Sequence, residues 1–238
     1  VIQENVAADK DQITIREPAA KGNHVRRAGL DFRSGECGLV AGTVWSPRSI
    51  GLAAAMNLPW LEVRRRPRVA LLATGDEIVR PGDPIGPNQI VSSNALAMAA
   101  FVRAHGAEPI DLGIALDNRQ SLTTMVEGIR GADLLVTMGG ASVGDHDLVQ
   151  SVLAEQGLQV DFWRIAMRPG KPLMFGDLRG VPMIGVPGNP VSSLVCALIF
   201  ILPALHAMLG IPDEPRRARR LAALGIDLPA NDEREDYL

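Results

Sequence analysis

Residues 69–77 read VALLATGDE, and this stretch decides the fold class of the chain. Five apolar residues in succession, without polar alternation, predict a strand that is buried on both faces. The glycine that follows allows the backbone to turn sharply at the end of the strand, and two acids come directly after it. A strand of this kind is typical of a parallel sheet that helices cover on both sides.

The pattern of strand, turn and helix repeats along the chain after this stretch. The apolar run at 134–138 predicts a second buried strand, and Pro190 predicts the start of a long apolar helix because proline is favoured in the first helical turn. The other expected elements are strands at 109–114, 159–165 and 182–186, and helices at 93–104, 121–129 and 147–156. Ser93 and Asn94 are expected to cap the first of these helices. The alternation predicts an α/β fold with a doubly wound parallel sheet.

The segments on either side of this region have a different pattern. Short strands at 13–15 and 38–40 and a short helix near 50–57 predict a partial β-rich domain. We therefore expect three parts: 1–66 a partial β-rich domain, 67–212 the α/β domain, and 213–238 the start of a C-terminal β domain. Because the pattern is already under way at Val1 and no element closes before Leu238, we expect a part of a longer polypeptide.

Composition and charge exclude several classes of protein. Of the 238 residues 47% are hydrophobic, and the net charge is -3, which argues against a disordered chain and against nucleic-acid or acidic-membrane partners. The arginine runs at 64–68 and 216–220 contain no aromatic residues, so we expect solvated linkers. The apolar stretch at 194–205 is shorter than a membrane span and contains Pro203, which favours a buried helix. Two distant cysteines without a CxxC motif favour a reducing, cytoplasmic compartment.

Two glycine-containing loops at predicted strand ends offer sites for a cation and for phosphate. Asp76 and Glu77 follow the first strand, and paired carboxylates suit Mg²⁺, although a turn with solvated acids is the alternative. Residues 139–147, GGASVGDHD, precede a predicted helix and form a plausible phosphate cradle from backbone N–H groups. No Lys-Ser/Thr pair ends this loop, so it is not a P-loop. Asp147 is expected either to bind the cation or to cap the helix.

Two further loops offer sites for anions. Arg164, Arg168 and Lys171 lie in one short proline-containing segment, and this set of cations suits an oxyanion, with ordinary surface charge as the alternative. Residues 185–193, GVPGNPVSS, lead into the helix at Pro190, whose free N–H groups together with Ser192 suit phosphate, with a purely structural turn as the alternative. All four loops follow strands, and ligands of open α/β sheets bind at the carboxyl ends of strands. The sequence contains no Ser-His-Asp or zinc motif, which favours anion binding, metal binding and positioning.

Taken in this order, the four loops resemble those of the molybdopterin molybdenumtransferase family, which includes bacterial MoeA and the E domain of animal gephyrin. The matching segments are 74–77, 88–94, 139–147, 168–172 and 187–192, and the resemblance continues into 25–31. It implies that the central doubly wound domain has the molybdopterin-binding fold, flanked by partial β domains. It also implies an enzyme that hydrolyses adenylylated molybdopterin in a Mg²⁺-dependent step, transfers molybdate to the dithiolene and releases AMP. The implied assembly is a homodimer, and the implied partners are the molybdopterin adenylyltransferase and molybdoenzymes.

The resemblance also implies roles for individual residues. The catalytic acids would be Glu77, Asp117, Asp147 and Asp31. The Mg²⁺ ligands would be Asp76, Glu77 and Asp147. The substrate would be bound by Thr74, Gly75, Gly139, Gly140, Ser142, Gly144, Arg164, Arg168, Lys171, Pro187, Gly188, Asn189, Pro190 and Ser192. The chain departs from the family pattern at Arg164 and Arg168, where lysine is usual, and at Leu30, where glutamate is common.

Two other functions remain open. A molybdopterin adenylyltransferase has the same central fold, but the flanking β segments argue against it because that enzyme is usually a single α/β domain. A non-catalytic scaffold on the same fold is the second alternative. The acids and cations retained in all four loops argue against it.

Overall fold

The computed structural model describes residues 1–140, 148–212, 223, 225–227 and 233–237. This part of the chain forms two compact units, Val1–Leu61 and Glu62–Leu238. The predicted division into three parts stays a prediction, because most of 213–232, including the second arginine run, lies outside the described residues.

The first unit contains little regular structure. Its elements are η1 (Gln3–Asn5), β1 (Val6–Asp9), β2 (Gln12–Ile15) and α1 (Pro47–Ala55). β1 and β2 form an antiparallel hairpin, and the hydroxyl of Ser46 caps α1 by accepting a hydrogen bond from the N–H of Ser49 at 3.2 Å. The strand expected at 38–40 is wrong. Gly38 and Leu39 form a bend, and Val40 is 70% exposed, so this segment pairs with no strand among the described residues.

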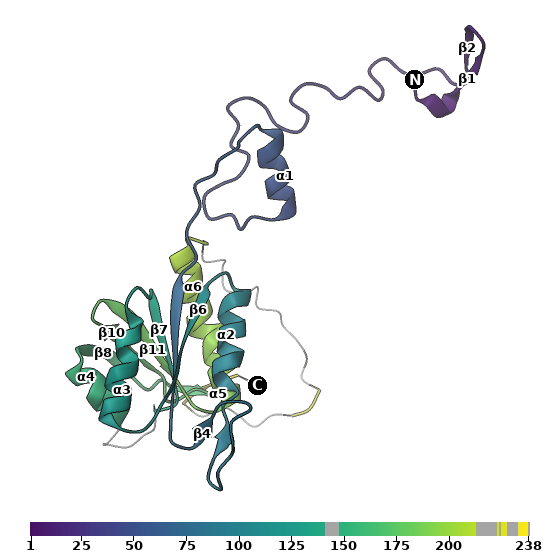
Figure 1. Cartoon of the computed structure of the whole chain (residues 1–238). Helices are drawn as coiled ribbons and strands as arrows, with labels where there is room; N and C mark the ends of the chain where they lie inside the picture. Colours follow the sequence, from purple (N-terminus) through teal and green to yellow (C-terminus); the bar gives the residue numbers. More distant parts are fainter. Residues whose placement is uncertain (141–147, 213–222, 224, 228–232, 238) are drawn as a thin grey trace. The chain divides into compact units, whose positions relative to one another are not determined.

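The second unit is built on a six-stranded sheet with helices on both faces (Figure 1). Its strands are β3 (Arg68–Thr74), β6 (Glu108–Ala115), β7 (Leu134–Met138), β8 (Leu158–Trp163), β10 (Met174–Leu178) and β11 (Val181–Val186). The order across the sheet is β6-β3-β7-β11-β10-β8. Two short pairs lie outside it, β4 (Ile78–Val79) with β5 (Ile90–Val91), and β9 (Met167–Arg168) with β12 (Glu235–Asp236).

The sheet is mixed, so the expectation of a wholly parallel sheet is wrong at one edge. β6, β3, β7 and β11 are parallel, but β10 is antiparallel to both of its neighbours. Leu178 pairs with Val181, which leaves a turn of Arg179 and Gly180 with φ values of 57° and 84°. Two positive φ values in a two-residue loop match the twist of a hairpin. The antiparallel strand β10 is therefore joined to β11 by a hairpin, whereas the edge strand β8 follows α4.

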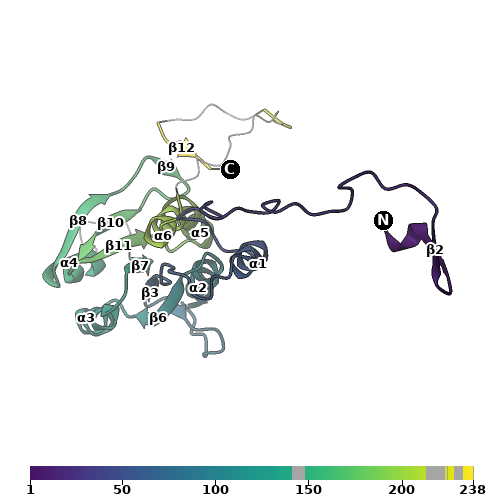
Figure 2. The same ribbon diagram turned by 90° about the horizontal axis from the view of Figure 1, so that it is seen from above.

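Helices form one layer on each face of the sheet (Figure 2). One layer consists of α2 (Asn94–Ala104), α5 (Pro190–Cys196), the π-helical η3 (Ala197–Ile201) and α6 (Leu202–Leu209). The other consists of α3 (Arg119–Val126), which continues into η2 (Glu127–Ile129), and α4 (Leu148–Glu155). The predicted doubly wound α/β architecture is confirmed.

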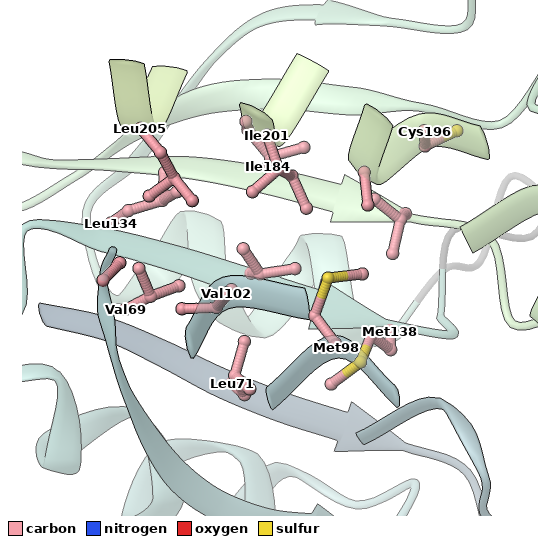
Figure 3. Close-up of a cluster of buried hydrophobic side chains, with 14 of the residues drawn as sticks. Val69, Leu71, Met98, Val102, Leu134, Met138, Ile184, Cys196, Ile201 and Leu205 are labelled. Atoms are coloured by element: carbon pink, nitrogen blue, oxygen red, sulfur yellow. The ribbon is translucent and has the colours of Figure 1, made fainter. Parts of the chain in front are cut away.

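Alternate residues of β3 enter different cores. Val69 and Leu71 pack with Met98 of α2 and Ile201 of η3 (Figure 3). The intervening residues Ala70 and Leu72 pack on the other face with side chains of α3 and α4. Burial on both faces explains why the strand is apolar throughout.

The helical run Pro190–Leu209 is longer than expected. By length and composition alone its 20 residues are able to cross a membrane, so the prediction that the apolar stretch is too short is wrong. Pro203 does not interrupt the run, because it lies in the first turn of α6 directly after the π-helical segment. Cys196, Ile201 and Leu205 are fully buried in the core against the sheet, as Figure 3 shows. The expectation of a core helix is therefore the one that the packing supports.

Candidate functional site

The ends of three parallel strands and the start of α2 meet at one edge of the sheet. Gly139, after β7, donates its N–H to the carbonyl of Val186 at 3.2 Å. A Cβ built on Gly188, after β11, would lie 3.5 Å from the Cα of Gly139. Asn94 Nδ2 donates to the carbonyl of Gly188 at 2.6 Å. The second and fourth predicted loops are thus in direct contact, and the first joins them through Thr74.

Asn94 reaches this loop because it does not act as a helix cap. Ser93 has helical dihedral angles, and its side chain makes no capping hydrogen bond, so the expected capping role is wrong for Ser93. Asn94 is the first residue of α2, and its amide contacts Gly188, 94 residues further along the chain.

Three acids gather where β3 and β6 end. Asp76 Oδ1 accepts a hydrogen bond from the N–H of Asp117 at 3.0 Å, and Gly75 donates its N–H to the carbonyl of Ala115 at 3.2 Å. Desolvation raises the pKa of Asp117, and the negative charges of Asp76 and Glu77 raise it further. The parallel pairing of β3 with β6 therefore brings together acids that lie far apart in the sequence.

Gly75 makes the compact turn of this acidic cluster possible. Its φ is 139°, and a Cβ at this position would collide with the carboxylate of Glu77, which folds back over it. Glycine adopts this φ without strain, whereas any other residue here would be strained and would also displace the Glu77 carboxylate.

An open hollow of about 530 Å³ lies beside these acids and is lined by Asp76, Glu77, Gly86, Pro87, Asn88 and Gln89. Gln89 connects the segment that lines the hollow to the end of β3, because Nε2 of Gln89 donates to the carbonyl of Asp76 at 3.2 Å. Its Oε1 accepts from the N–H of Gly86 at 3.0 Å. The hollow is large enough for part of a nucleotide-sized or pterin-sized ligand.

The acidic cluster has suitable chemistry for Mg²⁺ but is not a complete ligand set. Carboxylate oxygens are the ligands that this ion prefers. Among the described residues, no three His, Cys, Asp or Glu side chains are placed to hold one metal ion. The third predicted ligand, Asp147, lies outside the described residues, as do Ser142 and Gly144.

The turn at Gly139 and Gly140 presents backbone without side chains. Their φ values are 93° and 66°, and a Cβ on Gly139 would lie 2.7 Å from the carbonyl oxygen of Thr74. Thr74 and Thr137 are buried beneath this turn, and the structure gives neither hydroxyl a hydrogen-bond partner within the described residues. Because the N–H of Gly139 is bonded to the carbonyl of Val186, an anionic ligand at this strand end would be received by the N–H of Gly140.

The collision at Gly139 gives a testable result. We expect Gly139→Ala to lower the free energy of unfolding by about 1–3 kcal/mol, because positive φ and the close carbonyl both disfavour a side chain. The matched control is Gly180→Ala, where φ is also positive but no atom lies within 4 Å of the new Cβ. Urea unfolding measures the free energy of unfolding of both variants. The difference between their losses is the cost of the collision alone, because both share the cost of the positive φ. Equal losses would show that Gly139 is not closely packed.

The fourth loop is stabilised mainly by its own hydrogen bonds. Asn189 caps α5, because its Oδ1 accepts from the N–H of Ser192 at 3.2 Å and from the hydroxyl of Ser192 at 3.4 Å. The hydroxyl of Ser193 donates to the carbonyl of Pro187, and Pro190 occupies the first turn of the helix. The predicted roles of these residues in substrate binding stay predictions, whereas the capping roles are visible.

The basic loop has contacts to α5 and β12. A Cβ on Gly170 would lie 2.9 Å from the sulfur of Cys196, and burial raises the pKa of that thiol to about 11. The guanidinium of Arg164 lies 4.6 Å from the ring centroid of Trp163, and Lys171 is exposed. Arg168 forms an ion pair with Asp236. The three predicted cations therefore have different surroundings and do not form a single free cluster.

Two sequence expectations concern residues away from this edge. Asp31 lies in the first unit, where it is exposed and 3.4 Å from Arg26. The first arginine run is more than a solvated linker, because Arg65 forms a double hydrogen bond with Asp133 and Arg68 begins β3. Asn94, Thr137 and Asp236 were not predicted from the sequence as individual site residues. Thr137 lies within the strand predicted at 134–138, just before the glycine pair, and that position is the signal that pointed to it.

The raised pKa of Asp117 predicts a dependence of stability on pH. The folded chain keeps the Asp117 proton over a window above the ordinary value of 3.8 in which the unfolded chain has lost it. The free energy of unfolding therefore falls as pH rises through this window. We expect Asp117→Asn to remove this component, so that the variant gains stability relative to the native chain as pH rises above 3.8 and then levels off. Urea titrations across this range measure the difference, and a difference that does not change with pH contradicts the assignment.

Comparison with known proteins gives a consistent picture. Residues 70–207, more than half of the chain, match the family described as the probable molybdopterin binding domain. Molybdopterin molybdenumtransferase 2 of Mycobacterium tuberculosis is 38% identical over 224 residues, which are 92% of this chain and 55% of that protein. Molybdopterin molybdenumtransferase of a Nostoc species is 38% identical over 215 residues, 89% of this chain and 49% of that protein.

A solved structure supports the same relationship. The molybdopterin biosynthesis MoeA protein of Pyrococcus horikosii matches with a TM-score of 0.73 and 34% identity, covering 90% of this chain and 54% of that one. The chain spans about half the length of the relatives that it matches. The chain belongs to the family of the probable molybdopterin binding domain.

Proposed function

We propose that the protein is a molybdopterin molybdenumtransferase, which inserts molybdate into adenylylated molybdopterin and releases AMP. The proposal rests mainly on the acidic cluster at the carboxyl edge of the sheet. There Asp76, Glu77 and Asp117 lie together around the turn at Gly75. The similarity to relatives with that name over 92% of the chain supports it.

The residues at this edge suit the phosphate groups of the substrate and the Mg²⁺ ion. The backbone N–H of Gly140 would receive a phosphate group of the adenylate, with the bond from Gly139 to Val186 and the bond from Asn94 to Gly188 holding the two loops in place. Asp76 and Glu77, with Asp147, would hold Mg²⁺, which supplies positive charge to phosphate oxygens when bound. The pKa of Asp117 is raised first by desolvation and then by the negative charges of Asp76 and Glu77, and a bound cation would offset those charges.

The other elements of the proposal concern the whole protein. We propose a cytoplasmic homodimer whose partner subunit completes the site, and handover of pterin from the adenylyltransferase to molybdoenzymes. Lys171 of the exposed basic loop would receive molybdate.

The test is a reconstituted reaction. The full-length protein is mixed with adenylylated molybdopterin, Mg²⁺ and molybdate, and AMP release and molybdenum incorporation are followed together. We expect both products. Formation of the adenylate from ATP and molybdopterin would support an adenylyltransferase instead, and pterin binding without either product would support a non-catalytic scaffold.

A further inference from the structure

The segment Glu235–Tyr237 is attached to the basic loop along its backbone. Glu235 donates its N–H to the carbonyl of Ala166 at 2.9 Å, and Tyr237 donates its N–H to the carbonyl of Arg168 at 2.8 Å. These bonds pair β12 with β9 in parallel, so that Asp236 lies directly opposite Arg168. Tyr237 also packs against the core beneath the loop. Backbone and side chains thus hold this segment against the loop.

The side-chain contact between the two strands is a forked ion pair. Asp236 Oδ1 accepts from Nε of Arg168 at 3.0 Å, and Oδ2 accepts from Nη2. The Asp236 side chain is only 8% exposed, whereas that of Arg168 is 52% exposed. A carboxylate that is this buried requires a charged partner, and a two-point contact fixes the orientation of the guanidinium.

Two further backbone bonds close the neck of the loop. Arg164 donates its N–H to the carbonyl of Leu173 at 2.9 Å, and Ile165 donates to the carbonyl of Lys171 at 3.1 Å. The neck therefore fixes where the loop begins and ends, while Asp236 fixes its outer part at Arg168. Lys171 is exposed and lies in the neck, where its carbonyl accepts from Ile165, and it is three residues after Arg168 in the same loop.

We propose that Glu235–Tyr237 acts as a clamp on the basic loop and that Asp236 is a positioning residue, which holds Arg168 so that Lys171 faces the oxyanion substrate. Arg168 then has a structural role in place of its predicted role as an oxyanion ligand, and Lys171 keeps its own predicted role. This inference rests on the proposed function for the identity of the oxyanion, but the clamp itself is testable without it.

The experiment compares Asp236→Asn with Asp236→Glu, which restores the charge, and with Asp227→Asn, a control at an exposed aspartate nearby in the sequence. In the full-length protein, we expect Asp236→Asn to speed hydrogen exchange of the amides at 165–172 about tenfold, because the loop opens more often. We expect the KM for molybdate to rise about tenfold in the same variant while kcat at saturating molybdate changes little, because the lost charged contact affects binding. Asp236→Glu should recover part of the loss of loop protection and part of the increase in KM, and Asp227→Asn should match the native protein.

Hydrogen exchange within Leu134–Met138 reports whether the fold is intact. Arg168→Lys keeps the positive charge but loses the two-point contact, so it should raise the KM for molybdate in the same way.

The outcomes separate the two claims. Unchanged exchange and KM in Asp236→Asn would overturn the clamp. A lower KM would also overturn it, since this result would show that the released Arg168 is itself an anion ligand. If the native protein failed to consume adenylylated molybdopterin, the proposed function would be refuted. Faster hydrogen exchange of the loop in Asp236→Asn would still support the clamp in that case.

Discussion

Glu77→Gln is expected to reduce AMP release by the full-length protein about a hundredfold, which corresponds to ~3 kcal/mol of transition-state stabilisation. Glutamine keeps the size of the side chain but removes the negative charge that lies over Gly75 beside Asp76. The substitution should leave the fold unchanged, because the side chain is exposed. Initial rates at saturating substrate and Mg²⁺ measure the effect.

The matched control for this variant is Glu108→Gln. Glu108 is also exposed, but it begins β6 and so lies at the opposite end of that strand from Ala115 and the acidic cluster. We expect its rate to stay within about twofold of the native rate, since surface substitutions away from a site have small effects. If Glu77→Gln kept the native rate, the acidic cluster would have no part in the reaction.

Leu135→Ala is expected to lower the free energy of unfolding by about 3 kcal/mol, because it leaves a cavity in a core that cannot collapse to fill it. Leu135 is at the centre of the sheet on β7, has no exposed surface, and belongs to the core beneath α3 and α4. Chemical denaturation measures the change. The control is Leu96→Ala on α2, where the leucine is 59% exposed and the expected change is about 0.5 kcal/mol or less. Similar losses at both positions would contradict the two-core packing described for the sheet.

The sequence predicted the central strands and the doubly wound fold because their cause is local. β3 and β7 are buried on both faces, so each is a continuous apolar run that needs no knowledge of its neighbours. β10 was not predicted, since it is partly buried at alternate positions and follows a loop rich in proline and glycine. The two-residue spacing between it and β11 is a hairpin signal that the alternating pattern of strands and helices obscured.

The site was predictable only in part, for a similar reason. Asp76 and Glu77 follow a strand, and their position at the sheet edge follows from that fact alone. The contact between Asp76 and Asp117 depends on the register of β3 against β6, which the residues do not encode locally. Arg168 looked like a free cation because its partner, Asp236, lies 68 residues away. The sequence pattern therefore did not predict either of these contacts, because both join residues that are far apart in the chain.

A crystal structure of the full-length protein with adenylylated molybdopterin, without molybdate, tests the central claim most directly. The account predicts that the phosphate groups lie against the backbone of Gly139 and Gly140, with Asp76 and Glu77 beside them and part of the ligand in the hollow next to Asn88. A ligand bound elsewhere, with this edge of the sheet in contact with solvent alone, would contradict the account.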